Sequence, residues 1–258
     1  MRHRYDRLIN STVAFVAALF LSITLHEFAH GLTALSLGAT PMVFAGHEDH
    51  VPTLSAGREV VTALAGPLFS LVSGLAVLLL PRRGRGFGRL FVLWFGVLSV
   101  QNFAGYLMTG PFVAFGDIGK ALRLLSAPAV VYLGLFIAGG AGTIGLGWLV
   151  TRRLLELTDT TAPDRAAQLR QLAFFTRMAG VVVALLLSVS SDIFSRAGLF
   201  EAVAVFAAGL PASMARFFMP RLSVDGIGFS GGVPWGGLAL VAALTVARLT
   251  LLTRGIRL

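Results

Sequence analysis

The sequence predicts an all-α fold, a polytopic membrane helix bundle of about seven transmembrane helices. Of its 258 residues, 56% are hydrophobic and only 13% are charged, whereas a typical soluble domain carries about 25% charged residues. Apolar runs recur along the chain at close to the length of about 20 residues that a helix needs to cross the hydrocarbon core. Short arginine-rich segments separate these runs. We therefore expect most of the chain to be embedded in a lipid bilayer, which is its first expected partner.

Seven apolar runs follow one another, at Leu8–Leu37, Val60–Leu80, Leu90–Met108, Ala127–Val150, Ala173–Val189, Gly198–Ala215 and Pro234–Leu252. The first run is long enough to tilt within the membrane or to protrude from it. The sixth run gives the weakest prediction, so a bundle of six spans is the alternative.

The formal net charge of +9 comes from arginines that gather between the runs. These segments are the N-terminus, residues 82–89 and residues 152–170, and they fall on one side of the membrane if the spans alternate. Positive charge favours the cytoplasmic side. We therefore expect a cytoplasmic N-terminus in a multi-pass protein of the plasma (inner) membrane. The same pattern suits anionic lipid headgroups better than a nucleic acid, which is not an expected partner.

The first apolar run carries a metal-binding pattern, His26-Glu27-Phe28-Ala29-His30. Two histidines four residues apart share one face of a helix, so both imidazoles can reach one tetrahedral zinc ion. Glu27 stands beside this pair, where it can take a proton from a zinc-bound water. Burying these three side chains in lipid is costly unless they bind something. The chain has no cysteine, so Zn²⁺ with nitrogen and oxygen ligands is the predicted cofactor.

A third protein ligand is needed, and several residues compete for the role. Spans one and three run parallel, so Asp117, which follows span three, ends on the same side of the membrane as the histidines. Asp225 follows span six, which runs the other way, and is the alternative about 30 Å distant across the core. His47 and His50 lie in the loop 39–58 and are possible extra ligands. We expect this loop to be re-entrant or partly buried, because non-helical backbone at that depth must line a cavity.

Three segments together resemble the site-2 protease family of intramembrane zinc metalloproteases. The first is the segment from Thr24 to Leu32 around the HExxH pattern. The second is Ala63-Leu64-Ala65-Gly66-Pro67-Leu68-Phe69-Ser70, which is similar to the family's Ala-Gly-Pro segment. The third is Phe115-Gly116-Asp117-Ile118-Gly119, which is similar to the segment that supplies the family's aspartate ligand. The resemblance covers roughly residues 8–125.

The resemblance implies a catalytic core of three transmembrane helices in residues 1–125 and leaves residues 126–258 as a C-terminal transmembrane region of unknown role. It implies that His26, His30 and Asp117 bind zinc, that Glu27 is the general base, and that Asn102 contacts the substrate backbone. The chain departs from the family pattern at Ser70, where the family has Asn. Asp225 does have the family's spacing from a preceding proline, and it stays the alternative ligand.

These observations lead to an expected function, the hydrolysis of a peptide bond in or near a transmembrane helix of another membrane protein. The alternative is a zinc-binding membrane protein without protease activity, either a transporter or a degenerate homologue that acts as a scaffold. Intramembrane acids and histidines mark ion pathways as well as active sites. Glu27 discriminates between the two, because hydrolysis requires its carboxylate free beside the metal.

Overall fold

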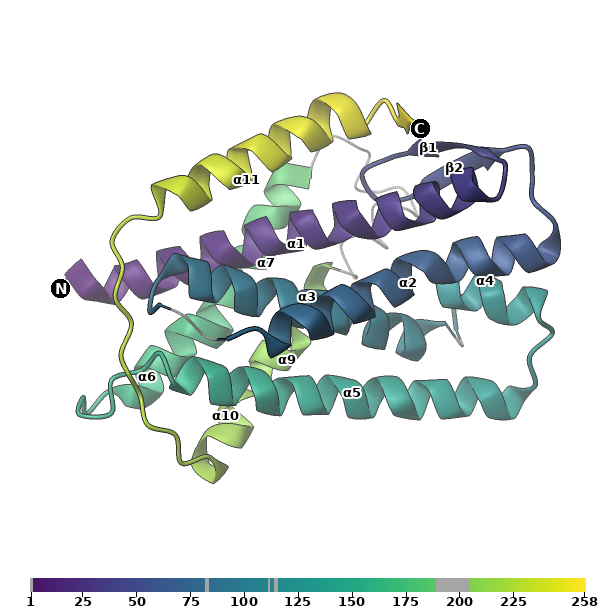
Figure 1. Ribbon diagram of the computed structural model, residues 1–258. Helices are drawn as coiled ribbons and strands as arrows, with labels where there is room; N and C mark the ends of the chain where they lie inside the picture. The colour runs from purple at the N-terminus through teal and green to yellow at the C-terminus, as the bar shows by residue number, and fades with distance from the viewer. Residues whose placement is uncertain (1, 82–83, 111, 114–115, 189–204) are drawn as a thin grey trace.

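The computed structural model describes residues 2–81, 84–110, 112–113, 116–188 and 205–258, and most of them are helical (Figure 1). Within these ranges, six helices are long and apolar enough to cross a membrane. They comprise α1 (Arg2–Ser36), α2 (Ala56–Leu79), α3 (Phe87–Thr109), α5 (Ala129–Leu155), the continuous run of α6 (Arg165–Arg170), η1 (Gln171–Phe175) and α7 (Thr176–Ser188), and α11 (Trp235–Ala247) extended by η3 (Arg248–Leu252). The prediction of a mostly helical chain with several apolar helices of membrane-spanning length is thus confirmed.

The predicted span over Gly198–Ala215 lies partly outside the described residues. Its described end forms short helices, α9 (Leu210–Ser213) and the start of α10 (Ala215–Phe218), which η2 (Met219–Arg221) follows. One further short helix, α4 (Asp117–Leu124), stands between α3 and α5.

Helix α1 is the centre of the bundle and packs against α2, α3, α7 and α11. In Figure 1 it runs almost the whole length of the molecule, with α11 along one side and α2 and α3 along the other. In the first half of α1, the rings of Phe15 and Trp94 pack edge to face, with centroids 5.3 Å apart. The Trp94 indole also donates a hydrogen bond to Ser11 Oγ at 3.0 Å. This buried contact fixes how α1 and α3 lie against each other.

The segment predicted as a loop, residues 39–58, is instead built around a β-hairpin. Strand β1 (Thr40–Val43) pairs antiparallel with β2 (Glu48–Val51) and, on its other edge, with β3 (Ile256–Arg257), so the order is β2-β1-β3. Pro41 and Val43 are buried while Met42 is exposed, which is the two-residue alternation of a half-buried strand. Strand pairing satisfies backbone groups that a loop at this depth would leave without partners. The all-α prediction therefore missed a small sheet.

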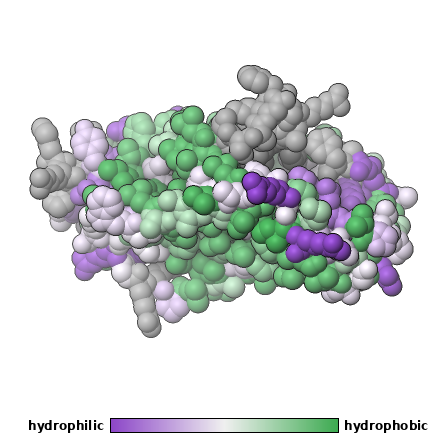
Figure 2. Space-filling view, turned by 90° about the horizontal axis from the view of Figure 1, so that it is seen from above, coloured by the Kyte–Doolittle hydropathy of each residue, from purple (hydrophilic) through white to green (hydrophobic). Residues whose placement is uncertain are grey.

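The outer surface is apolar, as a lipid-facing surface must be. Only 17% of the most apolar stretch of α5 is buried, and its exposed residues include Val130, Leu133, Ile137 and Ile144. Figure 2 shows one face on which hydrophobic residues make up most of the middle, interrupted by a few strongly hydrophilic side chains, with further hydrophilic residues at the two ends. An exposed apolar surface of this extent is expected in lipid and not in water.

Candidate metal centre

Three side chains from two helices converge at one point in the bundle. Helix α1 supplies His26 and His30, and the first residue of α4 supplies Asp117. His26 Nε2 lies 3.0 Å from Asp117 Oδ2 and 3.2 Å from His30 Nε2, and the remaining separation, from His30 Nε2 to Asp117 Oδ2, is 3.3 Å. Two ligands of a tetrahedral zinc ion with bonds of about 2.0–2.1 Å are separated by about 3.3 Å. The three atoms therefore have nearly the spacing of zinc ligands.

Helix α2 fixes the orientation of both imidazoles through hydrogen bonds at their Nδ1 atoms, which are the ring nitrogens that do not face Asp117. His30 Nδ1 donates to the Thr62 carbonyl oxygen at 2.7 Å, because a carbonyl only accepts. His26 Nδ1 lies 3.0 Å from Ser70 Oγ. With its Nδ1 hydrogen used in this way, a neutral His30 presents a lone pair at Nε2, facing a carboxylate oxygen. Electron-pair donors held this close require a cation or an additional proton between them.

The absence of a side chain at Gly66 leaves room next to the Nε2 atoms of both imidazoles. A Cβ atom at this position would lie 2.7 Å from His26 Nε2 and would also collide with His30 Nε2. Any side chain here would therefore fill the region that both ring nitrogens face. The two nitrogens and one carboxylate oxygen are also a donor set that zinc accepts. The residues present fit a zinc ion.

The buried carboxyl group next to this centre belongs to Glu27. Its residue is only 6% exposed, and within the described ranges of the chain its carboxylate makes no hydrogen bond or ion pair. It lies close enough to His30 and Asp117 to interact with both electrostatically. A buried carboxyl group without a partner is costly unless water or an ion compensates it.

Asn102, predicted as a contact to the substrate backbone, lies beside the histidines. Its amide nitrogen is 3.3 Å from His26 Nδ1. Sequence reasoning did not single out Tyr106, one helical turn further along α3, whose ring stacks on His26 at a centroid distance of 5.5 Å and an interplanar angle of 5°. Helix α3 therefore contacts His26 both at Nδ1, through Asn102, and on a face of its ring, through Tyr106.

The structure places the three alternative ligands away from this centre. Asp225 lines a cavity with Arg89, Arg152 and Glu156, at the end of α3 opposite to the end that Asp117 follows. His47 is exposed, and its Nε2 lies 3.8 Å from Asp49. His50 is turned toward Glu48 and Glu59. Among the described residues, only His26, His30 and Asp117 form a group with the geometry to hold a metal ion.

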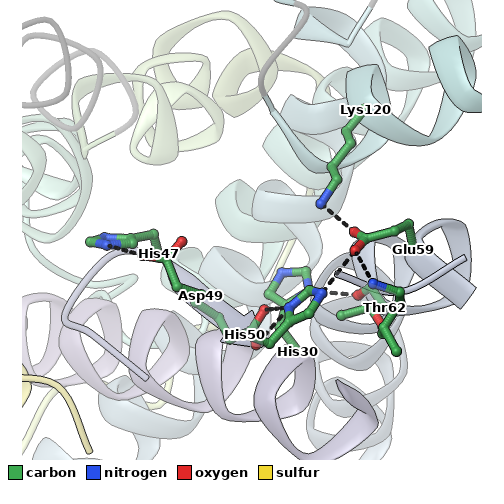
Figure 3. Close-up of polar contacts among 9 residues, drawn as sticks. His30, His47, Asp49, His50, Glu59, Thr62 and Lys120 are labelled. Carbon is green, nitrogen blue, oxygen red and sulfur yellow. Dashed lines mark hydrogen bonds and ion pairs between the residues drawn. The ribbon is translucent and has the colours of Figure 1, made fainter. Parts of the chain in front are cut away.

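A second polar cluster, which we call the Glu59 network, joins the hairpin to α2 and α4 (Figure 3). His50 Nε2 lies 2.8 Å from Glu59 Oε1, and His50 Nδ1 lies 3.1 Å from Glu48 Oε1. Glu59 Oε2 accepts a hydrogen bond from Lys120 Nζ at 2.6 Å. Burial opposes the charged form of His50, but hydrogen bonds to Glu59 and Glu48 outweigh it and raise the pKa of His50 above 6.5.

This shift predicts how protein stability depends on pH. Because the pKa of His50 is raised in the folded state, its contribution is complete below about pH 6.5 and is lost as the pH rises through the higher folded-state pKa. We expect the difference in Tm between wild type and His50→Gln to be largest near pH 6 and to shrink at alkaline pH. Thermal unfolding across this pH range measures it. His47→Gln, in the same hairpin but exposed, should show no such difference; a pH-independent effect of His50→Gln contradicts the prediction.

Four residues of α2 on one helical stripe define most of these contacts: Glu59, Thr62, Gly66 and Ser70. They are separated by three, four and four residues, which places them on one face. Sequence reasoning assigned no role to Glu59 or Thr62, although this spacing was the available signal. Comparison with protein-family models, curated proteins and solved structures finds no match, so the function must be argued from these residues themselves.

Proposed function

We propose that this chain is an intramembrane zinc metalloprotease that hydrolyses a peptide bond in or near a transmembrane segment of another protein. The observation that carries the proposal is the combination of the three converging donor atoms with the buried carboxylate of Glu27, which has no hydrogen-bond or ion-pair partner among the described residues. A transporter site needs ligands but no free carboxylate beside them. The sequence resemblance to the site-2 protease family supports the same assignment, with this chain as a divergent member.

Each residue has a role in this proposal. His26, His30 and Asp117 would hold the zinc ion, and Ser70 and the Thr62 carbonyl would keep the imidazoles in the ligating orientation. When bound, zinc supplies Lewis-acid chemistry and lowers the pKa of a water molecule that it holds. Glu27 would accept the proton of the attacking water at a carboxylate oxygen and later deliver it to the leaving amine. The substrate helix must unwind locally, because helical carbonyls are occupied by hydrogen bonds.

Residues 1–125 would form the catalytic core and residues 126–258 a further transmembrane region. The arginine-rich N-terminus would face the cytoplasm from the plasma (inner) membrane.

The test is cleavage of model transmembrane helices by the purified full-length protein in detergent micelles. We expect cleavage products from the wild-type protein, loss of cleavage after chelation, and recovery when zinc is added back. Product masses locate the cleaved bond within the apolar segment. If proteoliposomes that contain the protein take up zinc but no helix is cleaved, the protein is instead a transporter. Tight zinc binding with neither activity would identify a scaffold, and either result overturns the proposal.

A further inference from the structure

The Glu59 carboxylate is the meeting point of three segments of the chain. Its Oε2 accepts from Lys120 Nζ of α4 at 2.6 Å, and its Oε1 lies 2.8 Å from His50 Nε2 of β2. The backbone N–H of Leu54, between the hairpin and α2, also donates to Oε1 at 3.2 Å. Glu59 itself is only 7% exposed. Both oxygens are thus used, and one carboxylate ties α2 to the hairpin and to α4.

Helix α4 depends on such contacts for its position. It has eight residues, which is too few for a helix to be stable alone in water. Its buried face, which includes Ile118 and Leu122, packs it against the bundle, and Ala121 lies among Val60 and Ala63 of α2. Asp117 is the first residue of α4, one turn before Lys120. Because Asp117 and Lys120 belong to the same short helix, a contact that holds Lys120 in place also sets the position of Asp117, the third ligand.

The Glu59–Lys120 pair is poorly suited to stabilising the whole fold. The Lys120 side chain is 43% exposed, and ion pairs open to solvent contribute little to stability. Its geometric effect is larger, since a catalytic or metal-binding group must be held within about 0.5 Å of its productive position. The pair joins the helix that carries Asp117 to the helix whose Thr62 orients His30, one turn from Glu59.

We propose that Glu59 and Lys120 are positioning residues for the metal centre, which act at a distance by locking α4 so that Asp117 stays in line with the two histidines. His50 supports the pair by holding the second Glu59 oxygen from the hairpin side. The inference rests on the metal site of the proposed function, but it concerns metal retention and needs no proteolysis to be true. Neither residue belongs to the group of three that would ligate the metal.

The experiment measures zinc affinity of the full-length protein by competition with a chromophoric chelator. We expect Lys120→Met and Glu59→Gln each to weaken zinc binding about tenfold, at the lower end of effects seen for residues that orient metal ligands. The double variant should be no weaker than either single variant, because the two act as one unit. Lys120→Arg, which keeps the charge, should recover most of the affinity. The matched control is Arg123→Met, which removes an exposed charge from the same helix.

Two further readouts separate positioning from a general structural role. The visible spectrum of the Co²⁺-loaded protein should change in Lys120→Met, because the Asp117 oxygen is displaced, while the Tm of the metal-free protein stays within a few degrees of wild type. Zinc affinity equal to wild type in Lys120→Met, or an equal loss in Arg123→Met, overturns the inference. If the wild type binds zinc but cleaves nothing, the protease proposal fails while this inference is still decided by the affinities.

Discussion

Replacing Glu27 by Gln will leave zinc bound and will reduce cleavage of a transmembrane substrate by about 10²–10⁴-fold, the contribution of a well-placed general base. The amide has nearly the shape of the carboxylate, so packing in its buried position, 6% exposed, is kept. The amide cannot accept the proton of the attacking water, so only the proton transfer is lost. Cleavage rate and zinc content are measured on the same preparation.

The matched control for this variant is Asp49→Asn, which makes the same chemical change at an exposed acid of the nearby hairpin. Its cleavage rate should equal that of wild type. Cleavage by Glu27→Gln at the wild-type rate would remove Glu27 from the mechanism. Loss of zinc together with Glu27 would make it a ligand, and the centre would then be one that stores or transports the metal.

Replacing Asp117 by Ala will remove bound zinc, whereas Asp225→Ala will retain it. Catalytic zinc sites use three protein ligands, and without Asp117 the described residues leave only the two histidines at the centre. We expect wild type and Asp225→Ala to keep about one zinc per chain after gel filtration, and Asp117→Ala to keep close to none. Elemental analysis of the eluted protein measures this. The reverse result would mean that Asp225 approaches the histidines, against its position beside Arg89 and Glu156.

The sequence predicted the parts of this site that depend on periodicity and on membrane topology. The spacing of His26 and His30 is enough to place both on one helical face. The choice of Asp117 over Asp225 required only the alternation of spans, and the structure groups Asp117 with the histidines. Run length alone likewise predicted a helical membrane bundle.

Contacts between segments distant in sequence escaped prediction. The hairpin was missed because β1 and β2 are only four residues each and are completed by β3, which lies some 200 residues away in sequence. Thr62 contributes a backbone carbonyl, which no side-chain pattern reveals. In the sequence, Glu59 and Lys120 cannot be distinguished from ordinary surface charges, because their contact forms only when α2 and α4 pack together.

The free space at Gly66 suggests how other proteins with this chemistry could be recognised where sequence comparison fails. The chain lacks a Cβ atom where one would meet both ring nitrogens, so the missing side chain is as much a part of the centre as the histidines are. A three-dimensional template should therefore require an HExxH helix crossed by a second helix that presents glycine to both imidazoles. The template is completed by two hydrogen-bonding groups one turn to either side of the glycine, here the Thr62 carbonyl and the Ser70 hydroxyl. A search by three-dimensional arrangement can detect this combination, whereas a comparison of residue identities cannot.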